Sequence, residues 1–169
     1  MDIGDIIKYL RPDAEFATEG DRITFWGGPG ERPSDSEIAE AAIKADHFYT
    51  RIEKKKEILV EKDKRMSEGL IISVSSGNYT FKASENSLSK VNMALNNALL
   101  NDEGWSKEWK TRNDEYIIIN YNDIILIHNA LSSYIDNLFQ NEKNLKKLID
   151  DSNDPNDIDV GNDQYWASK

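Results

Sequence analysis

The sequence predicts an α+β fold, and three features support this prediction. Two long segments repeat apolar residues every seven positions, as amphipathic helices do. Short β-prone segments separated by turn residues precede and connect them, and an Asp-rich stretch follows. The predicted order is a short N-terminal β unit (1–33), a long, coiled-coil-like helix (34–68), a small domain of two β-hairpins packed on two helices (69–150) and an acidic extended tail (151–169).

Residues 1–33 combine short apolar segments with turn residues. Residues 23–26 fit a strand after a turn, whereas residues 6–10 fit either a helical turn or an edge strand. The segment FWGGPGERPSDSEIAEA then places a glycine-rich loop before a helix, an arrangement that can bind phosphate. This loop lacks the lysine of a Walker loop, does not match G-x-G-x-x-G, and loses an amide donor at Pro29, so we interpret it as a turn.

A long helix is predicted to begin at Ser34, because Glu37 follows at the spacing of a capping box. Its second half is polar, and Gly69 ends it. The apolar seam consists of Ile38, Ala45, Ile52, Leu59 and Met66, with Ala41 and Phe48 at the intervening core position. We expect four of these residues to bind a neighbouring chain, as in a homo-oligomer such as a trimer, although the alanines do not fix the oligomer number. They are Ile38, Ala45, Phe48 and Ile52.

Two hairpins and two helices are predicted in residues 69–150. The first hairpin surrounds Ser-Ser-Gly-Asn within residues 70–83, and the second surrounds residues 112–115. The second helix starts near Asn122 and carries a sevenfold stripe of its own. That stripe consists of Ile124, Leu131, Leu138 and Leu145. We interpret Trp105, Trp109 and Tyr116 as a cross-strand cluster in the core.

Composition restricts the function. The chain has 21 basic and 31 acidic residues and a net charge of −10, which argues against nucleic acid and anionic membranes as partners. It has no cysteine, which excludes thiolate catalysis, disulfides and cysteine-ligated metals. The first residues do not resemble a signal peptide, and no apolar run approaches the roughly 18 residues of a membrane span. We therefore expect a soluble protein made inside the cell.

No motif indicates an enzyme, a cofactor or a standard metal site. His47 and His128 lack the spacing of a helical zinc site, and no G-x-S-x-G nucleophile elbow occurs. The aspartates of residues 154–163 do not follow the EF-hand order, which leaves a solvated acidic tail or a non-standard divalent-ion contact. Tyr165 and Trp166 have no local core to enter, so we expect them to dock on a partner or on their own domain.

Several segments between Tyr49 and Asp150 occur in the order typical of a known family. They are Gly69 at a helix end, YTFKA from Tyr79, SENS from Ser84, the helix of residues 88–100, WKTRNDEY from Trp109, the helix start at Asn122, and the aromatic residues Tyr134 and Phe139. On these features the chain resembles a bacteriophage domain family of unknown function, found in tail-fibre assembly and other tail-associated proteins. Trp26 and the PSDSE segment from Pro33 are similar to the start of some phage tail proteins.

The resemblance implies a protein of the virion tail, assembled in the host cytoplasm. Its expected function is that of a structural or adaptor protein, which binds or caps a tail fibre or a neighbouring tail protein by protein–protein contact. A transient tail-fibre assembly chaperone is the alternative, and a small hydrolase acting on host surface sugar through acidic residues is the enzymatic one. In the first two cases Tyr165 and Trp166 are expected to dock on another tail protein.

Overall fold

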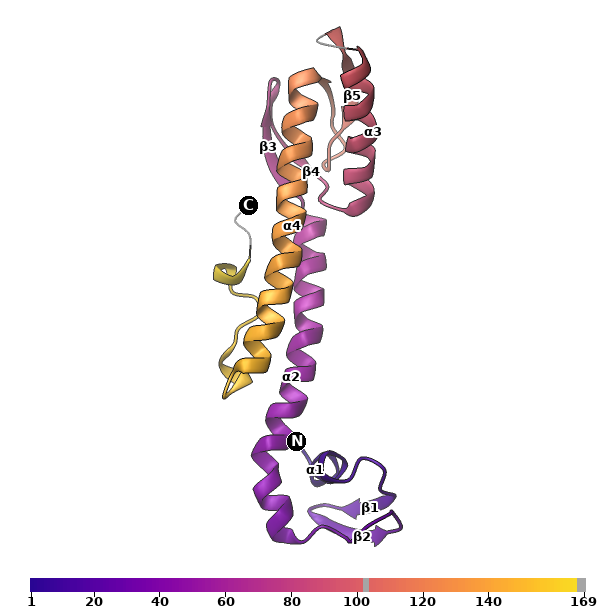
Figure 1. The fold of residues 1–169 in the computed structure, drawn as a ribbon, viewed down its shortest axis with the longest axis vertical. Coiled ribbons are helices and arrows are strands. Elements are labelled where there is room, and N and C mark those ends of the chain that lie inside the picture. The colour runs from indigo at the N-terminus through magenta and orange to yellow at the C-terminus, as the bar shows by residue number, and fades with distance from the viewer. Residues whose placement is uncertain (102–103, 167–169) are drawn as a thin grey trace. The chain divides into compact units, whose positions relative to one another are not determined.

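The computed structural model describes residues 1–101 and 104–166 and confirms the α+β class (Figure 1). Within these residues, four α-helices accompany three two-stranded antiparallel sheets and two short 3₁₀-helices. The elements are, in chain order, α1 (Ile3–Leu10), β1 (Phe16–Glu19), β2 (Arg22–Trp26), α2 (Asp35–Glu68), β3 (Leu70–Val74), β4 (Gly77–Phe81), α3 (Glu85–Asn101), β5 (Ser106–Lys110), β6 (Tyr116–Asn120), α4 (Tyr121–Asp151), η2 (Pro155–Asp157) and η3 (Asp163–Tyr165).

The chain divides into two compact units. Unit 1 comprises Met1–Lys55 and Ile149–Ile158, and unit 2 comprises Lys56–Leu148 and Asp159–Lys169. The boundary between the two units falls inside the segment 34–68, which the sequence analysis predicts as one long helix. Helix α2 therefore contributes its first half to unit 1 and its second half to unit 2, and different contacts stabilise each half.

Unit 1 has a small core formed by residues of α1, β2 and the first turns of α2. Asp2 accepts the N–H of Asp5 at 2.9 Å in a capping box, so residues 6–10 are helical rather than an edge strand. The capping box expected at the start of α2 is confirmed, because Ser34 Oγ accepts the N–H of Glu37 at 3.2 Å. The buried core residues are Ile6, Ile7, Ile23, Ile38, Ala41 and Ala45.

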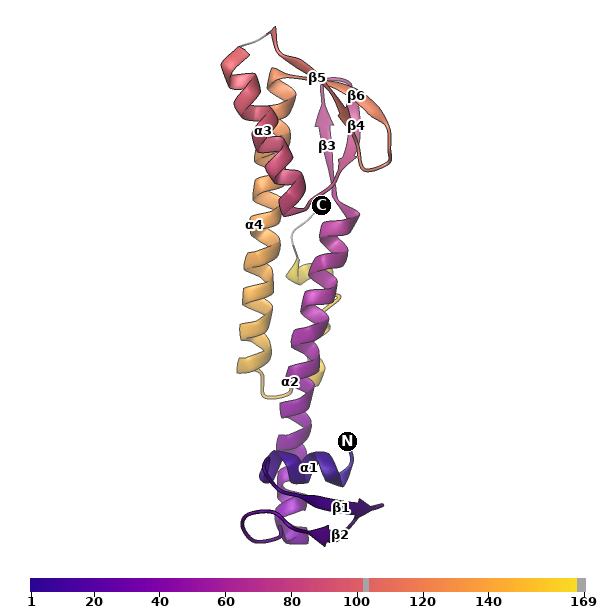
Figure 2. The ribbon, with the colours of Figure 1, turned by 90° about the vertical axis from the view of Figure 1, so that its right-hand side faces the viewer.

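Unit 2 holds both predicted hairpins together with α3 and most of α4 (Figure 2). Gly69 connects α2 to β3 with φ +79°, and a Cβ there would lie 2.4 Å from the carbonyl oxygen of Phe81. Both observations explain why glycine ends α2. At the other end of the hairpin, the buried carboxylate of Asp123 accepts the N–H of Ser75 at 2.8 Å and that of Asn120 at 3.0 Å. These bonds fix the β3–β4 turn against the start of α4.

The stripe predicted on α4 is fully buried within the chain. Its four sevenfold positions are no more than 2% exposed: Ile124, Leu131, Leu138 and Leu145. The stripe predicted on α2 does not continue into unit 2 in the same way. There Ile58 and Arg65 are buried, whereas Leu59, one position on, is 42% exposed. Successive residues point about 100° apart on a helix, so unit 2 buries a different strip of α2 from the one that the sequence period follows.

Candidate functional site

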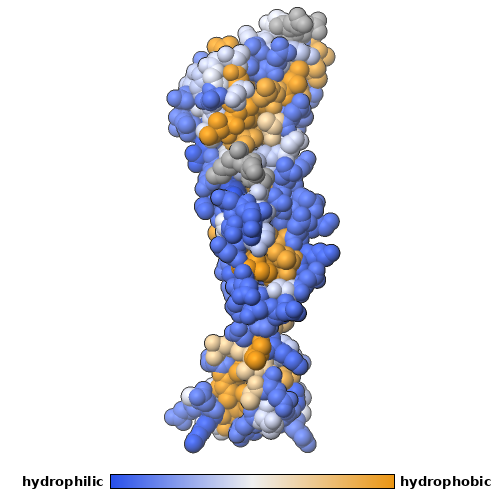
Figure 3. All heavy atoms as spheres, turned by 90° about the vertical axis from the view of Figure 1, so that its left-hand side faces the viewer, coloured by the Kyte–Doolittle hydropathy of each residue, from blue (hydrophilic) through white to orange (hydrophobic). Residues whose placement is uncertain are grey.

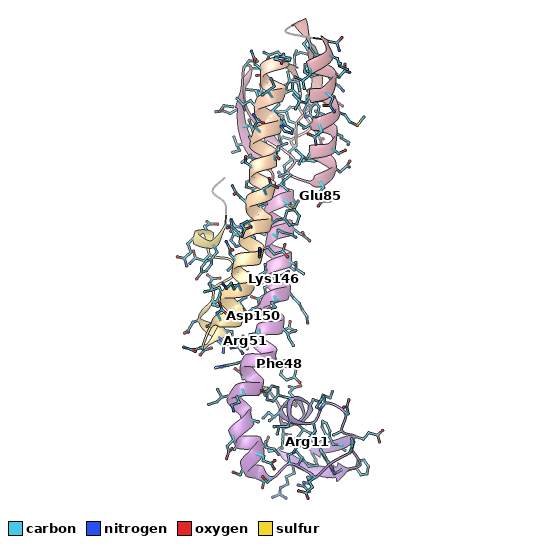
Figure 4. The ribbon with its side chains drawn as sticks, viewed as in Figure 1. Arg11, Phe48, Arg51, Glu85, Lys146 and Asp150 are labelled. Atoms are coloured by element: carbon cyan, nitrogen blue, oxygen red, sulfur yellow. The ribbon has the colours of Figure 1, made fainter. Side chains whose placement is uncertain are left out.

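Helix α2 carries the four predicted partner-binding residues, and the structure separates them into two pairs. Ile38 and Ala45 belong to the core of unit 1 and have little exposed surface. Phe48 and Ile52 are 44% and 38% exposed. The Phe48 ring packs against Tyr9, with centroids 5.4 Å apart, and Phe48 is marked in Figure 4. Only the second pair therefore offers surface to a partner.

The first part of the tail is bound to unit 1, because α2 side chains hold the end of α4. The Arg51 guanidinium donates to the carbonyl oxygens of Ile149 at 3.3 Å and Ser152 at 2.8 Å, which satisfies acceptors that the helix itself leaves free. Lys55 forms an ion pair with Asp150 at 2.6 Å (Figure 4). This part of the tail is therefore ordered by polar contacts that the sequence period does not reveal.

The tail is not extended throughout, in contrast to the prediction. It forms η2 and η3, and four of its residues are buried: Pro155, Ile158, Val160 and Trp166. Asn156 N–H donates to the carboxylate of Asp154, and this bond is the main reason that the pKa of Asp154 lies below its ordinary value. His47 lies 3.7 Å from the same carboxylate. A solvated segment without structure is thus the wrong description of residues 151–166.

The second part of the tail docks on unit 2 around a buried cation. We call this group, made of Arg65, Glu61, Asp163 and Trp166, the Arg65 site. Arg65 donates to Glu61 at 2.8 Å and to Asp163 at 2.6 Å, and its guanidinium lies over the Trp166 ring, 5.3 Å from the centroid. The indole N–H donates to Val160 O at 2.8 Å. Trp166 is 5% exposed, so of the two dockings left open, the structure has the one on its own domain.

Tyr165, the other predicted anchor, is half-buried rather than buried. It lines a shallow cavity of about 330 Å³ with Leu145 and Leu148, which are residues of α4. Leu148 is itself 40% exposed. Tyr165 therefore keeps some accessible surface, in contrast to its neighbour.

A pocket with a volume of about 470 Å³ lies in unit 2 between α3 and β5. Its residues fall into four chemical groups: buried apolar side chains, half-buried tryptophans, exposed lysines and polar or acidic side chains. We call it the Trp–Lys pocket. It is lined by the buried Phe81, Val91, Ala94 and Leu131, by Trp105 and Trp109, and by Lys82, Lys90, Lys107 and Lys110, together with polar residues that include Glu108 and Asp114.

The lysines of this pocket differ in how they are neutralised. Lys110 forms an ion pair with Asp114 at 2.7 Å, and the hydrogen bond raises the pKa of the ammonium above its ordinary value. Lys82 lies near enough to the same carboxylate to help lower the pKa of Asp114, whereas Lys90 and Lys107 form no ion pair with any residue in the described ranges. The lining holds four lysines against the carboxylates of Glu108 and Asp114, so it keeps a net positive charge on a chain whose net charge is −10.

The sequence interpretation of Trp105, Trp109 and Tyr116 as core residues is wrong for Tyr116, which is 64% exposed, and only half right for the two tryptophans. Trp105 and Trp109 are half-buried and face a cavity that a ligand can enter. The interpretation missed the lysines because they lie on α3, on β5 and in the segment after β4, with no common spacing. The sequence does contain one indication of the pocket. Trp105, Lys107 and Trp109 occupy alternate positions, so a strand places their side chains on one face.

Large hydrophobic side chains also remain exposed on the outer faces of the hairpins. Ile71 of β3 is 66% exposed, and Tyr116 and Ile118 of β6 are 64% and 59% exposed. The face of unit 2 that carries β3 shows a hydrophobic area among polar surface (Figure 3). Single exposed apolar residues are ordinary, but several on one small unit are typical of interaction surfaces.

Over residues 1–101 and 104–166, no three histidine or acidic side chains are grouped as metal ligands would be. None of the described helices combines the length and the apolar character that crossing a lipid bilayer requires.

Residues 49–162 match the model of a known protein family. The family described as "Domain of unknown function (DUF4376)" matches residues 49–162, which is more than half of the chain. No curated protein and no solved structure shows a significant match. The matched segment contains the whole of the Trp–Lys pocket and the helix end at Gly69. The chain therefore belongs to the DUF4376 family.

Proposed function

We propose that this protein is a structural or adaptor protein of a bacteriophage tail, which binds or caps a tail fibre or a neighbouring tail protein. The role is binding rather than catalysis and uses no cofactor. The tail assignment rests on the sequence motifs from Tyr49 to Asp150 that resemble tail-associated proteins. The net charge of −10 supports protein partners over nucleic acid or anionic membranes.

One observation carries the binding role: large hydrophobic side chains stay exposed on the hairpins of unit 2. Ile71, Tyr116 and Ile118 each expose more than half of their surface, although the adjacent positions Ile72, Ile117 and Ile119 are buried. A strand that is apolar on both faces is typical of a sheet covered on both sides. The second side is therefore proposed to be covered by a neighbouring tail protein.

We further propose that the protein forms a homo-oligomer, and a trimer is the arrangement that matches trimeric fibres. It depends on Phe48 and Ile52 of α2, because Ile38 and Ala45 are used inside unit 1. Light scattering after size exclusion tests it. Ile52→Asp should reduce the oligomeric mass to that of one chain, whereas Ile43→Asp, at a 69% exposed position of the same helix, should not. Equal masses for both variants would argue against this contact.

The location of the protein decides between the two assembly roles. We expect assembly in the host cytoplasm and retention in the virion tail. Quantitative mass spectrometry of purified virions should find the protein in a fixed ratio to the tail proteins. Its presence in infected cells but absence from the virion would replace the adaptor with a tail-fibre assembly chaperone. Absence of any association with tail proteins in infected cells would contradict both roles.

A further inference from the structure

The Trp–Lys pocket has features that specify a ligand class more narrowly than a general binding role does. We propose that it binds an extended acidic peptide segment of a partner protein, with one large apolar side chain inserted between α3 and β5. This inference rests on the proposed function, since it names the chemistry of one protein contact. Three features carry it: an apolar interior, an excess of lysines over carboxylates in the lining and a free strand edge.

The interior of the pocket is suited to a hydrophobic side chain. Phe81 and Leu131 are buried, and the half-buried Trp105 and Trp109 supply aromatic surface. Tryptophan side chains at the centre of an interface bury much area and are frequent binding hot spots. The volume of about 470 Å³ lies in the range of roughly 300–1,000 Å³ that ligand pockets usually have. An aromatic or large aliphatic side chain therefore fits the pocket chemically.

The lysines of the pocket favour a ligand with negative charge. Lys90 and Lys107 are exposed and form no ion pair with a described residue, while the exposed Lys82 and Lys110 both act on Asp114. Elsewhere in unit 2, Lys62 binds Glu142 at 2.7 Å and Arg65 binds Asp163 at 2.6 Å. At the pocket, by contrast, four lysines face only two carboxylates, Glu108 and Asp114, so the lining stays positively charged. Carboxylates of a partner complement such a group of ammonium ions.

The edge of β5 distinguishes a peptide from other anions. β5 pairs with β6 on one side, and no described strand pairs with its other side. An extended peptide can add to such an edge through its own N–H and C=O groups and place alternate side chains in pockets. Lys107 and Trp109 alternate on one face of β5, so an added strand would meet a cation and an aromatic surface at strand spacing. A nucleotide or an acidic oligosaccharide lacks this regular backbone pairing.

A peptide titration of the full chain tests the proposal. The probe is a short fluorescent peptide in which glutamates alternate with threonine or valine around one phenylalanine, and the readout is anisotropy. We expect saturable binding that weakens at least about tenfold when phenylalanine is replaced by serine or the glutamates by glutamine. The pocket variant Lys90→Glu with Lys107→Glu should weaken binding by a similar factor. The matched control, Lys143→Glu with Lys147→Glu on exposed positions of α4, should stay within about twofold.

Nuclear magnetic resonance locates the peptide independently of these variants. The indole N–H signals of Trp105 and Trp109 should shift on titration, whereas that of Trp26 in unit 1 should not. No saturable binding, equal binding by both lysine variants, or stronger pocket binding by a uronic-acid oligosaccharide or a mononucleotide would overturn the peptide assignment. If virions contain the protein while the peptide fails, only the pocket proposal falls. If the peptide binds but no tail association exists, only the tail role falls.

Discussion

The Arg65 site and the Trp–Lys pocket combine the same residue types within unit 2 but differ in what covers them. At the Arg65 site, the tail supplies both the aromatic ring of Trp166 and the carboxylate of Asp163 to a buried cation. At the pocket, tryptophans and lysines are present, and no acidic aromatic segment of the described chain covers them. The first site shows how this protein already binds an acidic aromatic segment. The second offers complementary chemistry to a segment from elsewhere.

The difference predicts that the two sites respond to mutation in opposite ways. A group that the chain covers contributes to stability, because its removal leaves a cavity or an unpaired charge. A group that only a partner covers contributes to binding and little to stability. Four variants, taken from the largest expected effect on folding to the smallest, test this distinction.

Trp166→Ala should have the largest effect. The ring is 5% exposed, donates a hydrogen bond to Val160 O and covers the Arg65 guanidinium. Its loss therefore removes packing and leaves Arg65 without its aromatic partner. We expect the free energy of unfolding to fall by about 3–5 kcal/mol, the usual range for a buried tryptophan. Urea unfolding followed by circular dichroism measures it. Leu100→Ala, at an 84% exposed position, is the control and should change stability by less than about 0.5 kcal/mol. Equal losses would mean that the tail does not dock.

Glu142→Gln should have the next largest effect. Burial raises the pKa of this carboxyl, but hydrogen bonds from Lys146 and Lys62 outweigh burial and leave the pKa below its ordinary value. The unfolded chain therefore binds the proton more readily, so the stabilisation is present above a pH of about 4.3 and is lost as the pH falls through the lower, folded value. At pH 7 we expect a loss of about 1–3 kcal/mol.

The pH dependence provides the sharper test of Glu142. The wild-type chain should lose stability in acid more steeply than Glu142→Gln does, because the amide cannot be protonated in this range. Leu100→Ala, the uncharged control at an exposed position, changes no titratable group and should retain the wild-type slope. Unfolding curves at several pH values below neutrality separate the two, and parallel curves for wild type and Glu142→Gln would contradict the role of the ion pairs.

Local sequence signals predicted local structure well. They did not predict the Arg65 site or the Trp–Lys pocket, because both depend on residues far apart in the sequence. Ser34 with Glu37 marks the start of α2, and Ser-Ser-Gly-Asn marks the β3–β4 turn, because neighbouring residues determine both features. Arg65 and Asp163 are 98 positions apart. Nothing in the charged run around Arg65 distinguishes it from its neighbours, so its burial follows from tertiary packing. The pocket lysines lie on α3, on β5 and in the segment after β4. They come together only when these segments fold against one another.

Asp163→Asn should have a small effect, although its oxygen lies 2.6 Å from Arg65. The Asp163 side chain is 91% exposed, so water competes with the ion pair, and such pairs usually contribute about 0–1 kcal/mol. The ratio of this loss to that of Trp166→Ala, measured under the same urea conditions, shows which contact anchors the tail. A loss as large as that of Trp166→Ala would assign the docking to charge rather than to the ring.

Lys90→Glu combined with Lys107→Glu should have the smallest effect on folding. Both lysines are exposed and form no ion pair with a described residue, so charge reversal breaks no contact of the described chain. We expect the free energy of unfolding to stay within about 0.5 kcal/mol of wild type, in contrast to the effect of Trp166→Ala. The same urea curves measure it, with Lys143→Glu and Lys147→Glu as the control. A loss above about 1 kcal/mol would show that the lysines serve the fold itself, and the distinction between a covered site and an open one would fail.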